Sequence, residues 1–181
     1  MSLQYIINIT NNSGNPQTYC LFAAPPSITS SGSKVDIVRF VIVGTETVLD
    51  GVTTIIQFPQ TILAVCGTRK LTTDALKDVK TFSAKPITLS TNDTPGTHAD
   101  GFMLGFGTRL ETRTGYYAMF TPHPLETYQI QPGLEYVVAV GSVATGSPVI
   151  DQQLLNTCGV SFNSTQTVGV VHLSDGKLVL S

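Results

Sequence analysis

The sequence predicts an all-β fold, and three observations carry that prediction. Threonine, valine and isoleucine together make up 55 of the 181 residues, and their β-branched side chains suit the pleated surface of a sheet. Charged residues make up only 12% of the chain, against about 25% in a typical domain, so hydroxyl and amide groups must supply the polar surface. Turn residues separate the short apolar runs about every ten residues, a spacing typical of β-sandwiches and barrels.

The length fits a single domain, and we expect one antiparallel β-sandwich over residues 1–181, of the jelly-roll or immunoglobulin-like type. A chain of this size can bury roughly 70% of the surface that its unfolded form exposes, so it can fold without disulfides or metals. The three cysteines, Cys20, Cys66 and Cys158, are too few and too widely spaced for a disulfide framework or a zinc site. We expect them to be buried free thiols.

Each strand expected in the first part of the chain is an apolar run that ends at turn residues. The segment 11–16 combines Asn, Ser, Gly and Pro and predicts a turn. Pro25 and Pro26 cannot donate to a ladder and end the second strand, and a polar loop is expected at 27–34. Asp50 and Gly51 have the chemistry of a hairpin turn. The strands expected here are 3–10, 18–22, 35–43, 52–58 and 61–66.

At most one short helix is expected, near residues 73–80. Thr73 can cap its N-terminus, Asp74 lies in the first turn, and Lys77 and Lys80 lie near its end, as the helix dipole favours. The helix has barely two turns, which is marginal for an isolated helix.

The second part of the chain ends in a predicted hairpin. Residues 168–173 and 177–180 flank a turn, and with Asp175 and Gly176 as a two-residue loop, Leu173 faces Leu178 and His172 faces Val179. Loops are expected at 91–101 and 141–148, and 149–155 fits neither class clearly. The other strands expected here are 81–90 with a break at Pro86, 102–106, 116–120, 127–130, 135–140 and 159–162.

Composition excludes several classes of function. A net charge of −2 with scattered basic residues is unlike a nucleic-acid-binding surface. No run of about 20 apolar residues predicts a transmembrane segment, and no motif predicts a metal or a cofactor. The N-terminus does not resemble a signal peptide. We therefore expect a soluble cytoplasmic protein, or a secreted one if a leader has been removed.

His123 is the candidate catalytic residue, with Tyr117 as its partner. Pro122 and Pro124 restrict the backbone on both sides of His123, just after the aromatic strand 116–120. A pre-organised histidine next to aromatic residues can act as a general base in a cofactor-independent isomerase, cyclase or hydrolase. The alternative interpretation is a rigid turn with an incidental histidine.

The candidate ligand-binding surface combines polar loops with the same histidine. The loop 91–101 is rich in Thr, Asp and Gly and also contains Asn, and the loop 107–115 is rich in Thr and Gly. Such loops are typical of polyol-binding surfaces and also of sandwiches in general. The candidate binding residues are His98, Asp100, Arg109, Arg113, Tyr116 and His123.

The leading functional hypothesis is a non-catalytic, lectin-like or defence-type protein that binds a carbohydrate or another small polar ligand. The alternatives are the cofactor-independent enzyme and a structural, self-assembling protein. We also expect a homo-oligomer, most simply a dimer, because charge is sparse and the apolar hairpin 168–180 can pair with a second copy if it lies at a sheet edge.

Overall fold

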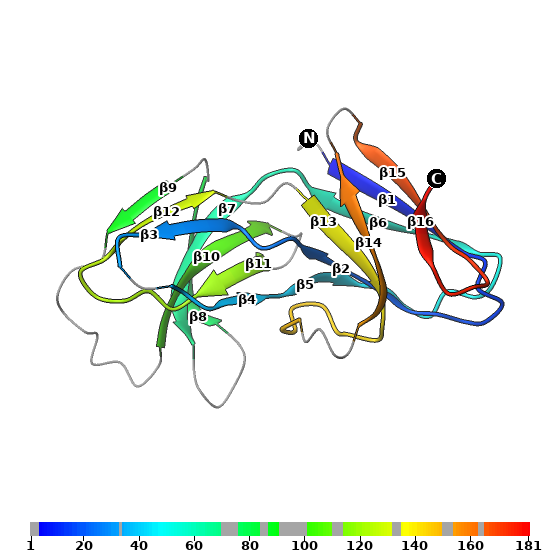
Figure 1. The fold of residues 1–181 in the computed structure, drawn as a ribbon, viewed down its shortest axis with the longest axis horizontal. Helices are drawn as coiled ribbons and strands as arrows, with labels where there is room; N and C mark the ends of the chain where they lie inside the picture. The colour runs from blue at the N-terminus through cyan, green and yellow to red at the C-terminus, as the bar shows by residue number, and fades with distance from the viewer. Residues whose placement is uncertain are drawn as a thin grey trace. The chain divides into compact units, whose positions relative to one another are not determined.

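The computed structural model describes residues 4–32, 34–69, 76–83, 87–90, 101–109, 114–131, 135–149, 154–162 and 165–181. These residues form strands joined by turns, bends and irregular segments, with no helix among them, so the all-β prediction is confirmed (Figure 1). In this part of the chain there is consequently no helix that is long and apolar enough to cross a membrane.

The chain divides into two compact units. Unit 1 comprises Met1–Ala24, Phe40–Gln60 and Leu134–Ser181, and unit 2 comprises Pro25–Arg39 and Thr61–Gly133. The chain therefore passes from one unit to the other after residues 24, 39, 60 and 133. That residues 1–181 form a single domain stays a prediction.

Unit 1 contains two four-stranded sheets. The first has the order β16-β15-β1-β6, and β1 runs parallel to β15 but antiparallel to β6. The second has the order β14-β13-β2-β5 and is antiparallel throughout. The strands are β1 (Gln4–Asn11), β6 (Thr53–Pro59), β15 (Thr167–His172), β16 (Leu178–Leu180), β2 (Tyr19–Ala23), β5 (Val41–Gly44), β13 (Glu135–Val140) and β14 (Leu155–Ser161).

Aromatic side chains join the two sheets of unit 1. Tyr5 of β1 stacks on Phe162 with ring centroids 4.1 Å apart, and Phe58 of β6 lies 4.8 Å from Tyr136 of β13. Aromatic pairs at these distances add attraction beyond the area that they bury. Because rings from both sheets meet, the two sheets pack face to face as a β-sandwich does.

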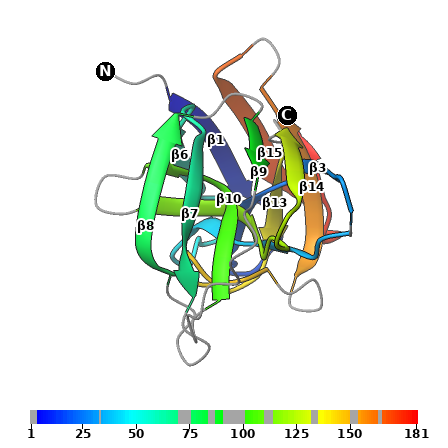
Figure 2. The same cartoon turned by 90° about the vertical axis from the view of Figure 1, so that its left-hand side faces the viewer.

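Unit 2 contains a five-stranded and a three-stranded sheet, with the orders β4-β11-β10-β7-β8 and β3-β12-β9. Figure 2 shows β8, β7 and β10 side by side. Phe120 of β11 lies 5.2 Å from Tyr128 of β12, so aromatic side chains join the sheets here too. The strands are β3 (Ser27–Ser30), β4 (Ile37–Arg39), β7 (Leu63–Arg69), β8 (Leu76–Ser83), β9 (Ile87–Ser90), β10 (Gly101–Arg109), β11 (Thr114–Phe120) and β12 (Thr127–Gln131).

The prediction of a short helix near residues 73–80 is wrong over the described residues. Leu76–Ser83 forms β8, which pairs antiparallel with β7 from Leu76 opposite Arg69 to Ser83 opposite Leu63. A two-turn helix has little stability of its own, whereas a strand beside β7 satisfies its backbone groups in a ladder. The predicted polar loop at 27–34 likewise contains β3, which pairs with β12.

The C-terminal hairpin is confirmed, but its predicted register is wrong by one residue. His172 lies opposite Leu178 and not opposite Val179. The Gly176 N–H donates to the Leu173 carbonyl at 2.9 Å, and Gly176 has a left-handed φ of 86°, as in a three-residue loop that ends in a glycine bulge. This shift by one residue turns His172 and Leu178 toward the core and leaves Leu173 exposed.

Candidate functional site

The structure places the predicted binding residues unevenly. His98, Asp100 and Arg113 lie outside the described residues. Arg109 is the last residue of β10, and Tyr116 belongs to β11. The loop expected at 107–115 is therefore shorter than predicted, because the two strands pair up to Arg109 opposite Thr114.

The two candidate catalytic residues lie in different environments. Tyr117 is only 2% exposed, inside unit 2, where its hydroxyl oxygen is also buried. His123 is exposed and belongs to the β11–β12 loop, defined here as residues 121–126. A general base at the surface and a phenol in the interior do not meet at one solvent-accessible point, so this arrangement gives little support to catalysis by the pair.

The side chain of the buried Tyr128 holds the β11–β12 loop in place through hydrogen bonds. The His123 backbone N–H donates to the Tyr128 hydroxyl at 2.6 Å, and that hydroxyl donates to the Glu126 carboxylate at 2.9 Å. Burial raises the pKa of Tyr128, and the Glu126 carboxylate raises it further, while the bond from His123 lowers it. The phenol therefore stays protonated and can act as acceptor and donor at once. The loop backbone is held in a defined conformation.

Leu125 is the most unusual residue of this loop. Its φ is 59°, in the left-handed region, and its side chain is 72% exposed. A left-handed conformation costs an ordinary residue roughly 1–2 kcal/mol. Strain of this kind concentrates at functional sites, where the surrounding structure imposes it. The loop thus presents an apolar side chain to solvent at an energetic cost.

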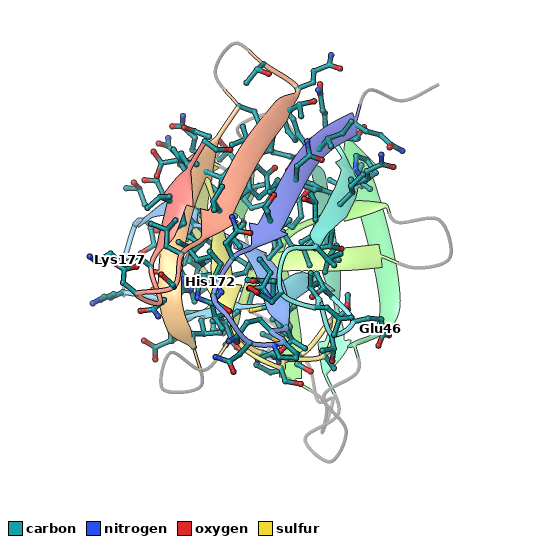
Figure 3. All side chains as sticks on the ribbon, turned by 90° about the vertical axis from the view of Figure 1, so that its right-hand side faces the viewer. Glu46, His172 and Lys177 are labelled. Carbon is teal, nitrogen blue, oxygen red and sulfur yellow. The ribbon has the colours of Figure 1, made fainter. Side chains whose placement is uncertain are left out.

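A second polar cluster lies inside unit 1 and was not predicted. The Tyr19 hydroxyl and His172 Nδ1 are hydrogen-bonded at 3.1 Å, and both side chains are buried. Asn11 is also buried, and its Nδ2 donates to the carbonyls of Asn15 at 2.8 Å and of Val48 at 2.9 Å. In Figure 3, His172 lies among the strands, whereas Lys177 lies at the hairpin surface.

This cluster resembles a structural network more than a reactive site. Burial, and then the Asp50 carboxylate, raise the pKa of Tyr19 to about 12, so the phenol is neutral at physiological pH. The other buried members of the cluster, His172 and Asn11, are also hydrogen-bonded, as interior polar groups generally are. No local motif could have revealed the pair, because Tyr19 and His172 come from opposite ends of the chain.

The described residues offer no other evident reactive centre. Burial raises the pKa of the Cys20 thiol to about 11, and burial also raises the pKa of Cys158. Thiols with raised pKa values are poor nucleophiles, since the thiolate is the reactive form. Within the described ranges, no three His, Cys, Asp or Glu side chains are grouped so that they could hold a metal ion.

Comparisons with known proteins add no assignment: no protein-family model matches the sequence, and no curated protein or solved structure shows significant similarity to it.

Proposed function

We propose that the chain is a non-catalytic, lectin-like protein that binds a carbohydrate or another small polar molecule through the β11–β12 loop. The observation that carries this proposal is Leu125, which combines a left-handed backbone with 72% exposure to solvent. The strained backbone does not bury the Leu125 side chain within the fold. A contact between this side chain and a ligand would explain why the strained conformation is maintained.

The loop has the chemistry that a sugar requires. The imidazole of His123 offers ring nitrogens for hydrogen bonds to hydroxyl groups, and Leu125 supplies an apolar surface for the C–H groups of a pyranose ring. Because the Tyr128 hydroxyl already holds the loop backbone, binding costs little conformational entropy.

A glycan array, together with a thermal-shift screen of small polar compounds, tests this proposal. With a ligand in hand, we expect Leu125→Ala and His123→Ala each to weaken binding at least about 10-fold, the effect of losing roughly 1.4 kcal/mol. Leu49→Ala is the matched control, because Leu49 is similarly exposed but lies in unit 1, and it should bind as the wild type does. The proposal would be overturned if neither screen finds a ligand, or if a ligand binds both loop variants as tightly as it binds the wild type.

The alternative of a cofactor-independent enzyme rests on His123 and Tyr117 and has less support, because Tyr117 is buried. If a substrate were found, His123→Ala should lower turnover by at least about 100-fold, as loss of a general base does. Unchanged turnover would remove His123 from any mechanism.

A further inference from the structure

The sheet edges of unit 1 differ in how they are covered. At β5, the Val41 N–H donates to the Ser147 carbonyl at 2.9 Å, and the Gly146 N–H donates to the Val41 carbonyl at 2.7 Å. The edge strands β14 and β16 lie close to each other. β6 is the remaining edge, and among the described residues of unit 1 no strand pairs with it on the side away from β1.

The backbone groups at this edge can be identified from the hydrogen-bond pattern. The Asn11 N–H of β1 donates to the Val52 carbonyl at 2.9 Å, and bonded pairs recur at every second residue of an antiparallel ladder. The N–H and C=O groups that point away from β1 are therefore those of Thr53, Ile55 and Gln57. These three side chains are also exposed.

β6 lacks the features that usually protect a sheet edge. Its sequence, Thr-Thr-Ile-Ile-Gln-Phe-Pro, contains no charged residue, and its proline is the last residue, Pro59. Natural edges are commonly protected by lysine, by an internal proline or by a bulge. The opposite positions on the outer face of β1, Ile6, Asn8 and Thr10, are also uncharged. In Figure 3, β15, β1 and β6 follow one another across this face.

We infer that two copies of the chain pair through β6. The two β6 strands lie antiparallel about a two-fold axis that passes beside Ile55, so that Ile55 faces its own copy and Thr53 faces Gln57. The open backbone groups are centred on Ile55, which makes the edge self-complementary, as a two-fold interface requires. Because neither strand carries charge, no like-charge repulsion opposes the pairing. This inference is independent of the ligand proposed for the β11–β12 loop.

The dimer joins the two β6-containing sheets into one continuous sheet. Pairing of one short strand buries less than the roughly 1,200 Å² that stable interfaces need. We therefore expect a weak dimer, with a dissociation constant on the order of 10–100 µM, which is typical of small transient interfaces.

Charge substitutions at Ile55 test the two-fold pairing. Ile55→Lys and Ile55→Glu should each be monomeric, because two like charges then face each other across the axis. An equimolar mixture of the two variants should recover the dimer, since Lys then faces Glu. Sedimentation equilibrium over a dilution series gives the masses, and urea unfolding confirms that the exposed substitution leaves the fold intact.

Leu180→Lys is the matched control. Leu180 is 57% exposed on the edge strand β16, and Ile55 is 59% exposed on β6, so the two variants compare the two edges of one sheet. Leu180→Lys should dimerise as the wild type does. A wild-type mass of 19.3 kDa at every concentration, Ile55 variants that each dimerise normally, or a mixture that stays monomeric would each overturn the inference. Loss of dimer in Leu180→Lys alone would assign the interface to the C-terminal hairpin instead.

Discussion

At the scale of single residues, Leu125 allows backbone strain to be separated from side-chain chemistry. Leu125→Ala and Leu125→Gly both remove the exposed side chain, but only glycine adopts the left-handed conformation without a Cβ clash. We therefore expect Leu125→Gly to be more stable than Leu125→Ala by about 1 kcal/mol, measured by urea unfolding. Equal stability of the two variants would mean that the loop relaxes to an ordinary conformation.

Tyr19 makes a prediction about alkaline pH. Its pKa is raised to about 12 in the folded chain, whereas an unfolded tyrosine loses its proton near 10. The folded state therefore holds the proton more tightly, and this contribution to stability is complete below pH 10 and is lost as the pH rises toward 12.

The variant Tyr19→Phe isolates this effect. It leaves His172 buried without its phenol partner, so the free energy of unfolding at pH 8 should fall by about 1–3 kcal/mol. The gap in unfolding free energy between wild type and variant should narrow between pH 10 and 12, because only the wild type carries the titrating phenol. A gap that stays constant across this range would contradict the raised pKa of Tyr19.

Single residues were predictable only where the signal was local. His123 was identified because prolines flank it, and it does lie on a constrained loop. Leu125 carried no signal, since left-handed positions are usually marked by glycine or asparagine. Tyr19 and His172 required knowledge of which strands face each other, and the sequence alone does not specify that.

At the scale of elements, Gly105 indicates how closely two strands of unit 2 approach. A Cβ at Gly105 would collide with the Ala118 carbonyl oxygen and lie 2.8 Å from the Met119 Cα, whereas a Cβ at Gly159 in β14 would meet no atom within 4 Å. Gly105→Ala should therefore lower the free energy of unfolding by at least about 2 kcal/mol, because the added methyl group overpacks the contact between β10 and β11.

Gly159→Ala is the matched control in a strand of unit 1. It should be neutral or should stabilise the chain by about 0.4–1 kcal/mol, because alanine restricts the unfolded chain. Thermal and urea unfolding of the two variants provide the comparison. Similar stabilities would mean that β10 and β11 can separate to accommodate a methyl group.

Element positions followed well from apolar runs and turn residues, but pairing did not. The strand expected at 135–140 is β13 (Glu135–Val140), and the one expected at 3–10 is β1 (Gln4–Asn11). The errors at β8 and in the C-terminal hairpin have a common cause. In both places, pairing with a neighbouring strand determines the structure. Leu76–Ser83 forms a strand because it pairs with β7, and the register of β16 is set by its pairing with β15.

At the scale of the whole molecule, the composition was sufficient to predict the all-β class, but it did not predict the division into two units. Length alone favoured one domain over residues 1–181. The sequence has no long linker at the points at which the chain crosses between units. At residues 37–44, for example, β4 is followed by Phe40 and then at once by β5.

The interleaved order of the strands has a consequence for the nascent chain. Unit 2 can assemble once the ribosome has released β12, whereas β1 must remain without its parallel partner until β15 has been made. β1 can pair with β6 once residues 53–59 have been made, but its other edge stays open for most of translation, and exposed strand edges are prone to aggregate. Closing the chain from β1 to β15 is a long-range step, and such steps slow folding. Unit 1, whose strands are made both first and last, should thus be the last part of the molecule to fold.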